Sequence, residues 1–211
     1  MKSFIKTLEE ENLSDCYYLE KGDVCFYFGD YTPRGGYDCS DVNRLIANLK
    51  KGIDRKDRGD YKYKDLAIEQ CVSMVKSVLN DVLEQTKDPI VIIPIPPSKS
   101  KEHQLYDDRM LRIATQASLN EERINVIEFV EQIHSTDAFH LSESSRPTPN
   151  QLQNNYRILK QIPQNSEVVL IFDDVLTTGS HFKAIKNLLL EQYPYLEGKI
   201  YGLFIAKVVR T

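Results

Sequence analysis

The chain lacks several features that would place it in large classes of protein. No apolar run approaches membrane-spanning length, and the first residues lack the apolar segment of a secretory signal. None of the four cysteines forms a Cys-x-x-Cys pair, which disfavours a zinc ribbon. Basic residues number 27 and acidic residues 31, so no excess of positive charge favours nucleic acid as the main ligand. These absences predict a cytoplasmic protein that neither enters a membrane nor binds nucleic acid.

The common signatures of nucleotide-binding and hydrolytic enzymes are also missing. The sequence has no Gly-x-x-x-x-Gly-Lys-Ser/Thr, Gly-x-Gly-x-x-Gly, Gly-x-Ser-x-Gly or His-Glu-x-x-His motif. Asp173 and Asp174 are adjacent rather than spaced as Asp-x-Asp, which argues against a haloacid-dehalogenase phosphatase. These enzyme classes can therefore be set aside.

What is present is the alternation of strands and helices that is typical of a parallel sheet in an α/β fold. With 211 residues and 41% hydrophobic residues, the chain can build one domain with additions. Ser40 is expected to cap the first helix, and Leu66 is expected on the apolar face of the second. The predicted strands are residues 24–28, 90–93, 124–130, 168–172 and 199–209, and the predicted helices are residues 40–51, 65–85, 107–117, 151–159 and 180–192.

The most informative segment is residues 168–180, Val-Val-Leu-Ile-Phe-Asp-Asp-Val-Leu-Thr-Thr-Gly-Ser. An apolar strand leads into two carboxylates, and a loop of small residues then opens onto a helix. Ligands of open α/β sheets bind beyond the carboxyl ends of the strands. A helix N-terminus offers unpaired N–H groups to a phosphate, and carboxylates accept hydrogen bonds from hydroxyl groups. The segment therefore suits a ribose 5-phosphate.

This segment resembles the phosphoribosyl-pyrophosphate (PRPP) signature of type I phosphoribosyltransferases. The resemblance implies that Asp173 and Asp174 orient the ribose hydroxyls, as catalytic residues, and approach Mg²⁺ through water. It also implies that the loop holds the 5-phosphate through four residues: Thr177, Thr178, Gly179 and Ser180. The alternative is an ordinary strand, turn and capped helix, since acids near a helix N-terminus are favourable in any protein.

A second candidate segment is the stiff loop Pro-Ile-Pro-Pro-Ser-Lys at residues 94–99. In type I enzymes a loop at this position contacts pyrophosphate, so the resemblance implies that Ser98 and Lys99 bind PRPP. Arg109, on the first turn of the next predicted helix, could reach the same anion or pair on the surface with Asp108 or Glu102. A proline-stiffened turn with solvated lysines is the alternative for this loop.

Residues 132–150 form a long polar stretch with little periodicity, and such loops inside compact domains are often functional. Type I enzymes close a lid over the reacting ribose, which excludes water from the site. A cation on the lid can neutralise the departing pyrophosphate. Arg146 is the first candidate for this catalytic role, and His140 is a candidate PRPP contact. A solvated loop with scattered polar residues is the alternative.

Within this superfamily the chain is most similar to ComF-like phosphoribosyltransferases. The resemblance rests on Leu-Ile-x-x-Leu-Lys at residues 45–50, on the proline loop, and on Arg-x-Thr-x-x-Gln at residues 146–151. It implies a type I phosphoribosyltransferase fold, with residues 1–60 as an N-terminal hood over a core of residues 61–211. The expected reaction is Mg²⁺-dependent transfer of a phosphoribosyl group from PRPP to an unidentified nitrogen base, with release of pyrophosphate. Assembly as a homodimer is a further expectation. The alternative function is a PRPP- or nucleotide-sensing module, or a ComF-like accessory module, that acts through a protein partner without catalysis.

Overall fold

The computed structural model describes residues 5–8, 10–135 and 147–209. It is an α/β protein whose central six-stranded sheet has the order β1-β2-β8-β7-β3-β4. All neighbouring strands are parallel except the short β1, which runs antiparallel to β2. The predicted α/β class with a mostly parallel sheet is confirmed. The strands of this sheet are β1 (Lys6–Thr7), β2 (Val24–Tyr31), β3 (Ile90–Pro94), β4 (Ile124–Val126), β7 (Val168–Leu176) and β8 (Ile200–Val208).

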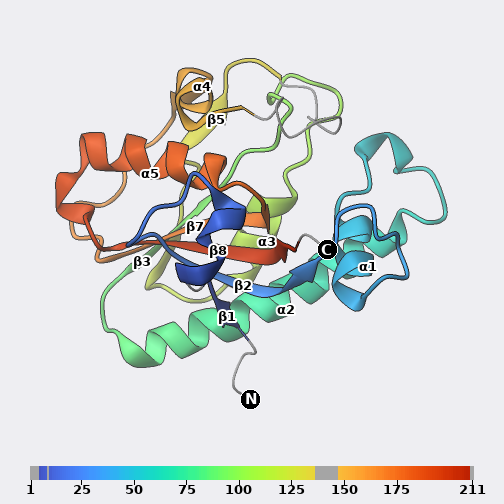
Figure 1. Ribbon diagram of the computed structural model, residues 1–211, viewed down its shortest axis with the longest axis horizontal. Coiled ribbons are helices and arrows are strands. Elements are labelled where there is room, and N and C mark those ends of the chain that lie inside the picture. Colours follow the sequence, from blue (N-terminus) through green and yellow to red (C-terminus); the bar gives the residue numbers. More distant parts are fainter. Residues whose placement is uncertain (1–4, 9, 136–146, 210–211) are drawn as a thin grey trace.

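Helices cover both faces of this sheet (Figure 1). One face packs against α5 (Ser180–Gln192) and the segment that contains the 3-10 helix η1 (Glu10–Cys16). The other face packs against α1 (Asp41–Leu49), α2 (Lys62–Gln85) and α3 (Arg109–Ala117). The central strands are apolar along almost their whole length because both of their faces are buried.

Smaller elements lie beside these layers. A separate two-stranded antiparallel sheet joins β5 (Val130–Gln132) to β6 (Tyr156–Ile158), and the helix α4 (Pro149–Asn154) precedes β6. Thr148 caps α4 with a full capping box. Two further 3-10 helices occur in the described residues, η2 (Ile53–Arg55) and η4 (Pro194–Leu196). None of the helices in the described part of the chain is long and apolar enough to cross a membrane.

Several predicted boundaries are wrong, each for a tertiary reason. The strand expected at residues 124–130 is two strands, β4 and β5, which belong to different sheets. The helix expected at residues 151–159 ends at Asn154, because the next residues pair with β5. Strand β7 continues past Phe172 to Leu176, since β8 pairs with it along this extension. Leu66, expected in the core, is 55% exposed.

The N-terminal residues take part in the central sheet. Strand β2 pairs in parallel with β8, and η1 packs against the sheet face that α5 covers. Residues 1–60, predicted as a hood, therefore supply an inner strand of the sheet as well as α1. The parallel strands end at a common edge, and the loops that follow β7, β3 and β2 meet there. The candidate site lies at this edge.

Candidate functional site

The turn between β7 and α5, predicted to bind a phosphate, passes through a left-handed glycine into the N-terminus of α5. Gly179 adopts a left-handed conformation (φ 80°) directly before Ser180, the first residue of α5. An added Cβ atom at Gly179 would lie 2.5 Å from the side chain of Leu19, so both the backbone conformation and the close packing require glycine. The first turn of α5 contains no acidic residue. The positive end of this helix dipole is therefore not offset by an acidic residue of its own first turn.

An N-terminal segment lies across this turn. The backbone N–H of Tyr18 donates to the carbonyl of Thr178 over 3.1 Å, and Leu19 packs on Gly179. The hydroxyls of Thr178 and Ser180 are buried and lie 3.3 Å apart. The structure thus brings the four predicted loop residues together. It also shows that residues 18–19 form one wall of the loop, which the sequence analysis did not identify.

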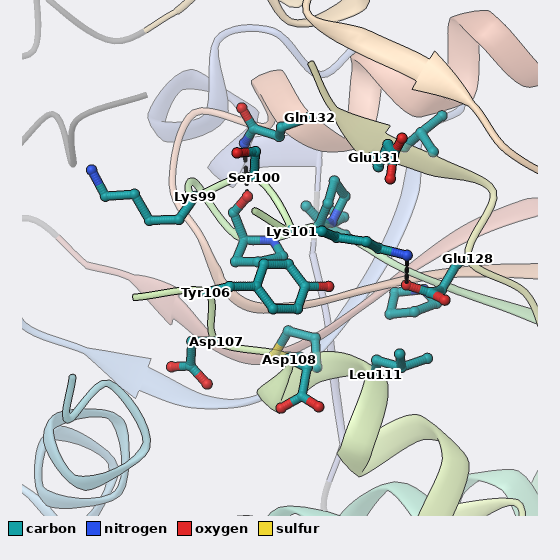
Figure 2. Close-up of a pocket in the computed structure, with 16 residues that line it drawn as sticks. Lys99, Ser100, Lys101, Tyr106, Asp107, Asp108, Leu111, Glu128, Glu131 and Gln132 are labelled. Atoms are coloured by element: carbon teal, nitrogen blue, oxygen red, sulfur yellow. Dashed lines mark hydrogen bonds and ion pairs between the residues drawn. The ribbon is translucent and has the colours of Figure 1, made fainter. Parts of the chain in front are cut away.

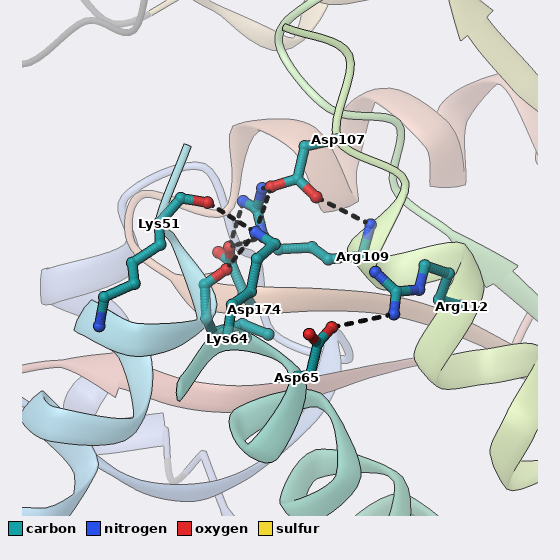
Figure 3. A network of polar contacts seen from close by, with 8 residues as sticks. Lys51, Lys64, Asp65, Asp107, Arg109, Arg112 and Asp174 are labelled. Carbon is teal, nitrogen blue, oxygen red and sulfur yellow. Dashed lines mark hydrogen bonds and ion pairs between the residues drawn. The ribbon is translucent and has the colours of Figure 1, made fainter. Parts of the chain in front are cut away.

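The two adjacent carboxylates point to opposite faces of the sheet, as alternation along a strand requires. Asp174 lies on the face that α1 and α3 cover, where its carboxylate is 7% exposed. Arg109 donates to its Oδ2 through Nε (3.2 Å) and through a terminal nitrogen (2.6 Å). The Nζ of Lys50 lies 3.2 Å from its Oδ1. Both oxygens of Asp174 are therefore occupied by cations. Figure 3 shows the contact with Arg109.

These contacts shift the pKa values of the two carboxyl groups in opposite directions. Burial opposes the ionisation of Asp174, but Lys50 and Arg109 outweigh it and hold the pKa of this carboxyl well below its usual range. Burial and the neighbouring charge of Asp174 raise the pKa of Asp173 to about 7. The half-buried Asp173 accepts a hydrogen bond from the N–H of Asp174 at Oδ1. Asp173 is thus the carboxylate available to a ligand, while Asp174 is an anchor for two cations.

Arg109 is more deeply engaged than the sequence suggested. The alternative of a surface pairing with Asp108 or Glu102 is wrong, because the guanidinium pairs with Asp174 and with Asp107 (2.8 Å). All three guanidinium nitrogens of Arg109 therefore donate to carboxylates of the protein itself, Asp174 and Asp107. The chain folds Arg109 inward because α3 begins there, directly beside the end of β7.

The proline loop after β3 borders a separate, small pocket of about 20 Å³ (Figure 2). Lys99 lines this pocket together with Tyr106, and Lys101 pairs across it with Glu128 over 2.8 Å. The side chain of Gln132 donates to the carbonyl of Pro97 over 2.9 Å, which ties the loop to β5. The lining of the pocket includes Asp107 but neither Asp173 nor Asp174. Ser98 and Lys99 therefore lie on the same sheet edge as the turn after β7, next to the pocket.

Some predicted residues cannot be placed. Arg146 and His140 lie outside the described residues, and of the predicted lid only residues 132–135 and 147–150 are described. Conversely, the structure assigns importance to Lys50 and Asp107, which were not predicted as site residues. The Leu-Lys pair at the end of α1 contained a signal for Lys50. No local pattern marks Asp107.

The site contains too few ligands to hold a metal ion without a substrate. Among the described residues, no group of three or more histidine, cysteine, aspartate or glutamate side chains could bind a metal. Mg²⁺ in phosphate-transfer sites commonly needs only one or two carboxylates together with substrate oxygens. Asp173 fits that smaller requirement, whereas both oxygens of Asp174 are occupied by Arg109 and Lys50.

Comparison of the chain with protein-family models finds no match, and comparison with curated proteins finds none either.

Proposed function

We propose that this protein is a type I phosphoribosyltransferase that uses PRPP as its phosphoribosyl donor. The single observation that carries the proposal is the turn from β7 to α5. There a left-handed glycine and a helix N-terminus without acidic residues follow the carboxyl end of a central parallel strand, and the half-buried Asp173 lies within that strand, three residues before its end. This combination supplies donors for a phosphate and an acceptor for ribose hydroxyls.

The proposed reaction is a substitution at C1 of the ribose. The bond between C1 and the pyrophosphate oxygen breaks, and its electron pair leaves with pyrophosphate. A nitrogen lone pair of the acceptor base forms the new C1–N bond, and the proton of that nitrogen passes to water. The transition state carries positive charge on the ring, as in glycoside cleavage.

Each part of the site has a separate role in this reaction. The residues 177–180 would hold the 5-phosphate, and Asp173 would accept hydrogen bonds from the ribose hydroxyls and stabilise the positive ring. Asp174 would keep Arg109 and Lys50 in place rather than touch the ribose. Substrate oxygens would hold Mg²⁺, together with Asp173 through water. The ion would neutralise charge on the leaving pyrophosphate.

A second candidate function is PRPP or nucleotide binding without turnover, for example in a sensor that acts on a partner protein. The observation that favours it is the occupation of Asp174 by two cations, which leaves one carboxylate for the ribose instead of two. The two functions share the phosphate loop and differ in whether pyrophosphate is released. Action in the cytoplasm and assembly as a homodimer belong to the same proposal.

The test is calorimetry with PRPP in the presence and absence of Mg²⁺, followed by pyrophosphate release with a panel of nitrogen bases. We expect Mg²⁺-dependent binding that weakens by about 1.5–3 kcal/mol in Asp173→Asn, the scale of a lost charge-assisted hydrogen bond. Asp30→Asn, a matched change in an exposed ion pair with Lys6, should bind as the wild type does. Absence of any heat or thermal shift at millimolar PRPP would remove the phosphoribosyltransferase and the PRPP sensor. Binding without pyrophosphate release for every base would favour the sensor.

A further inference from the structure

The most deeply buried charged side chain in the described residues is Lys64 on α2, which is 0% exposed. The proposed reaction does not use it directly. Burial lowers the pKa of Lys64, and the carboxylate of Asp107 opposes this change. An ammonium group is buried at this depth only where it is paired and fully hydrogen-bonded. Its partners therefore indicate what it holds in place.

Lys64 has three N–H donors, and the structure supplies three acceptors. Its Nζ lies 2.8 Å from the carbonyl oxygen of Leu49, 2.8 Å from that of Lys51 and 2.7 Å from Oδ2 of Asp107. The full donor capacity of the ammonium is used. Two of these bonds go to main-chain atoms at the end of α1, and the third goes to the residue two positions before α3 (Figure 3).

The two carbonyls flank Lys50, the residue that caps the C-terminus of α1. The last carbonyls of a helix lack partners within the helix, and Lys64 supplies one from a different helix. By fixing the peptide groups on both sides, Lys64 fixes the main chain from which the Lys50 side chain extends. The Nζ of Lys50 then reaches Oδ1 of Asp174 over 3.2 Å.

The third bond acts on the other cation. The Oδ2 of Asp107 accepts from Lys64 and also from the guanidinium of Arg109, over 2.8 Å. The Oδ1 of Asp107 accepts from the main-chain N–H of Arg109 over 3.3 Å. Asp107 therefore holds both the backbone and the side chain of Arg109. The remaining guanidinium nitrogens meet Oδ2 of Asp174.

We propose that Lys64 and Asp107 are positioning residues of the site, which together hold Lys50 and Arg109 against Asp174. A single buried ammonium thus links α1, α2 and α3 to the end of β7. The charges alternate in sign along the chain of contacts from Lys64 to Lys50, so each ion is neutralised by its neighbours. The functional consequence rests on the proposed PRPP site, whereas the positioning of Arg109 can be measured without it.

The experiment compares Lys64→Met with Lys76→Met, the same change at an exposed position of α2. The first readout is the Nε–H resonance of Arg109 in ¹⁵N NMR, assigned by its disappearance in Arg109→Lys. In the wild type this N–H donates to Asp174 and should exchange slowly with water. We expect Lys64→Met to lose the protected signal, Lys64→Arg to retain part of it and Lys76→Met to leave it unchanged.

The second readout is PRPP affinity by calorimetry, with each variant measured at a temperature where it is folded. Lys64→Met should weaken binding about tenfold, the scale of residues that act through another group. Should Lys64→Met fail to fold, Asp107→Asn provides the same two readouts, since Lys64 keeps its two carbonyl partners there. A protected Arg109 signal in a folded variant of either kind would overturn the proposal. If the wild type binds no PRPP, the proposed function fails, and the Arg109 signal alone still decides the role of Lys64.

Discussion

The contrast between Asp173 and Asp174 leads to a specific prediction about stability. Although the two residues are neighbours in the sequence, their replacement by asparagine should have opposite effects. Asp174→Asn removes the carboxylate that neutralises Arg109 and Lys50, and leaves a buried guanidinium with Asp107 as its remaining carboxylate partner. Removing one partner of a buried ion pair typically lowers the free energy of unfolding by about 3–5 kcal/mol. Because the pKa of Asp174 is lowered in the folded state, this stabilisation is fully present at pH 7.

Asp173→Asn should preserve or raise the free energy of unfolding. The pKa of Asp173 rises from 3.8 to about 7 on folding, so the wild type loses stability as the pH increases between these values. Access of water to this half-buried side chain reduces the expected gain to about 1–2 kcal/mol. An asparagine Oδ1 can still accept the hydrogen bond from the N–H of Asp174.

Urea unfolding at several pH values between 4 and 8 measures both effects. The advantage of Asp173→Asn over the wild type should grow as the pH rises towards 7 and stay constant above it. Asp30→Asn, in an exposed pair with Lys6, should change stability by less than about 1 kcal/mol at every pH. Equal losses in both site variants, or no loss in Asp174→Asn, would refute the assignment of one ligand-facing and one anchoring carboxylate.

Three other expectations concern residues around the site and the core. Gly179→Ala should lower the free energy of unfolding by at least about 1–2 kcal/mol, measured by urea unfolding, because of its positive φ and the contact with Leu19; unchanged stability would show that the turn can rearrange. Lys186→Met should cost about 1.5–3 kcal/mol in the same assay, because the buried carboxylate of Asp23 loses one partner at 2.5 Å and keeps Lys183 at 3.0 Å; unchanged stability would contradict this. A thiol reagent should modify one cysteine rapidly in the native protein, Cys39, since the other three are buried, and all four after unfolding; more than one rapid equivalent would show that the core opens.

The elements that the sequence predicts well are those with strong local signals. Helix α5 spans the predicted residues 180–192, and Ser40 caps α1 through its side chain, as expected. Both helices begin at recognisable residues and carry apolar positions at helical spacing. The apolar strands β3 and β8 were likewise predicted to within one residue at each end.

The polar contacts of the site could not be predicted in the same way. Arg109 and Asp174 are 65 positions apart in the sequence, and their pairing follows from where α3 begins relative to β7. The buried position of Lys64 contradicts the usual exposure of lysine, so a pattern of hydrophobicity places it on the surface. The extent of β7 depends on pairing with β8, which a local reading of the apolar run omits.

The parallel pairing of β2 with β8 has a consequence for how the molecule folds. Val24 lies opposite Tyr201, so this contact closes one of the longest loops that the chain can form. Contacts between such distant residues carry a high loop-closure entropy and form slowly. A ribosome-bound chain cannot complete the central sheet until the last strand has emerged. Removal of β8 would leave β2 and β7 with unpaired edges, and such edges promote aggregation.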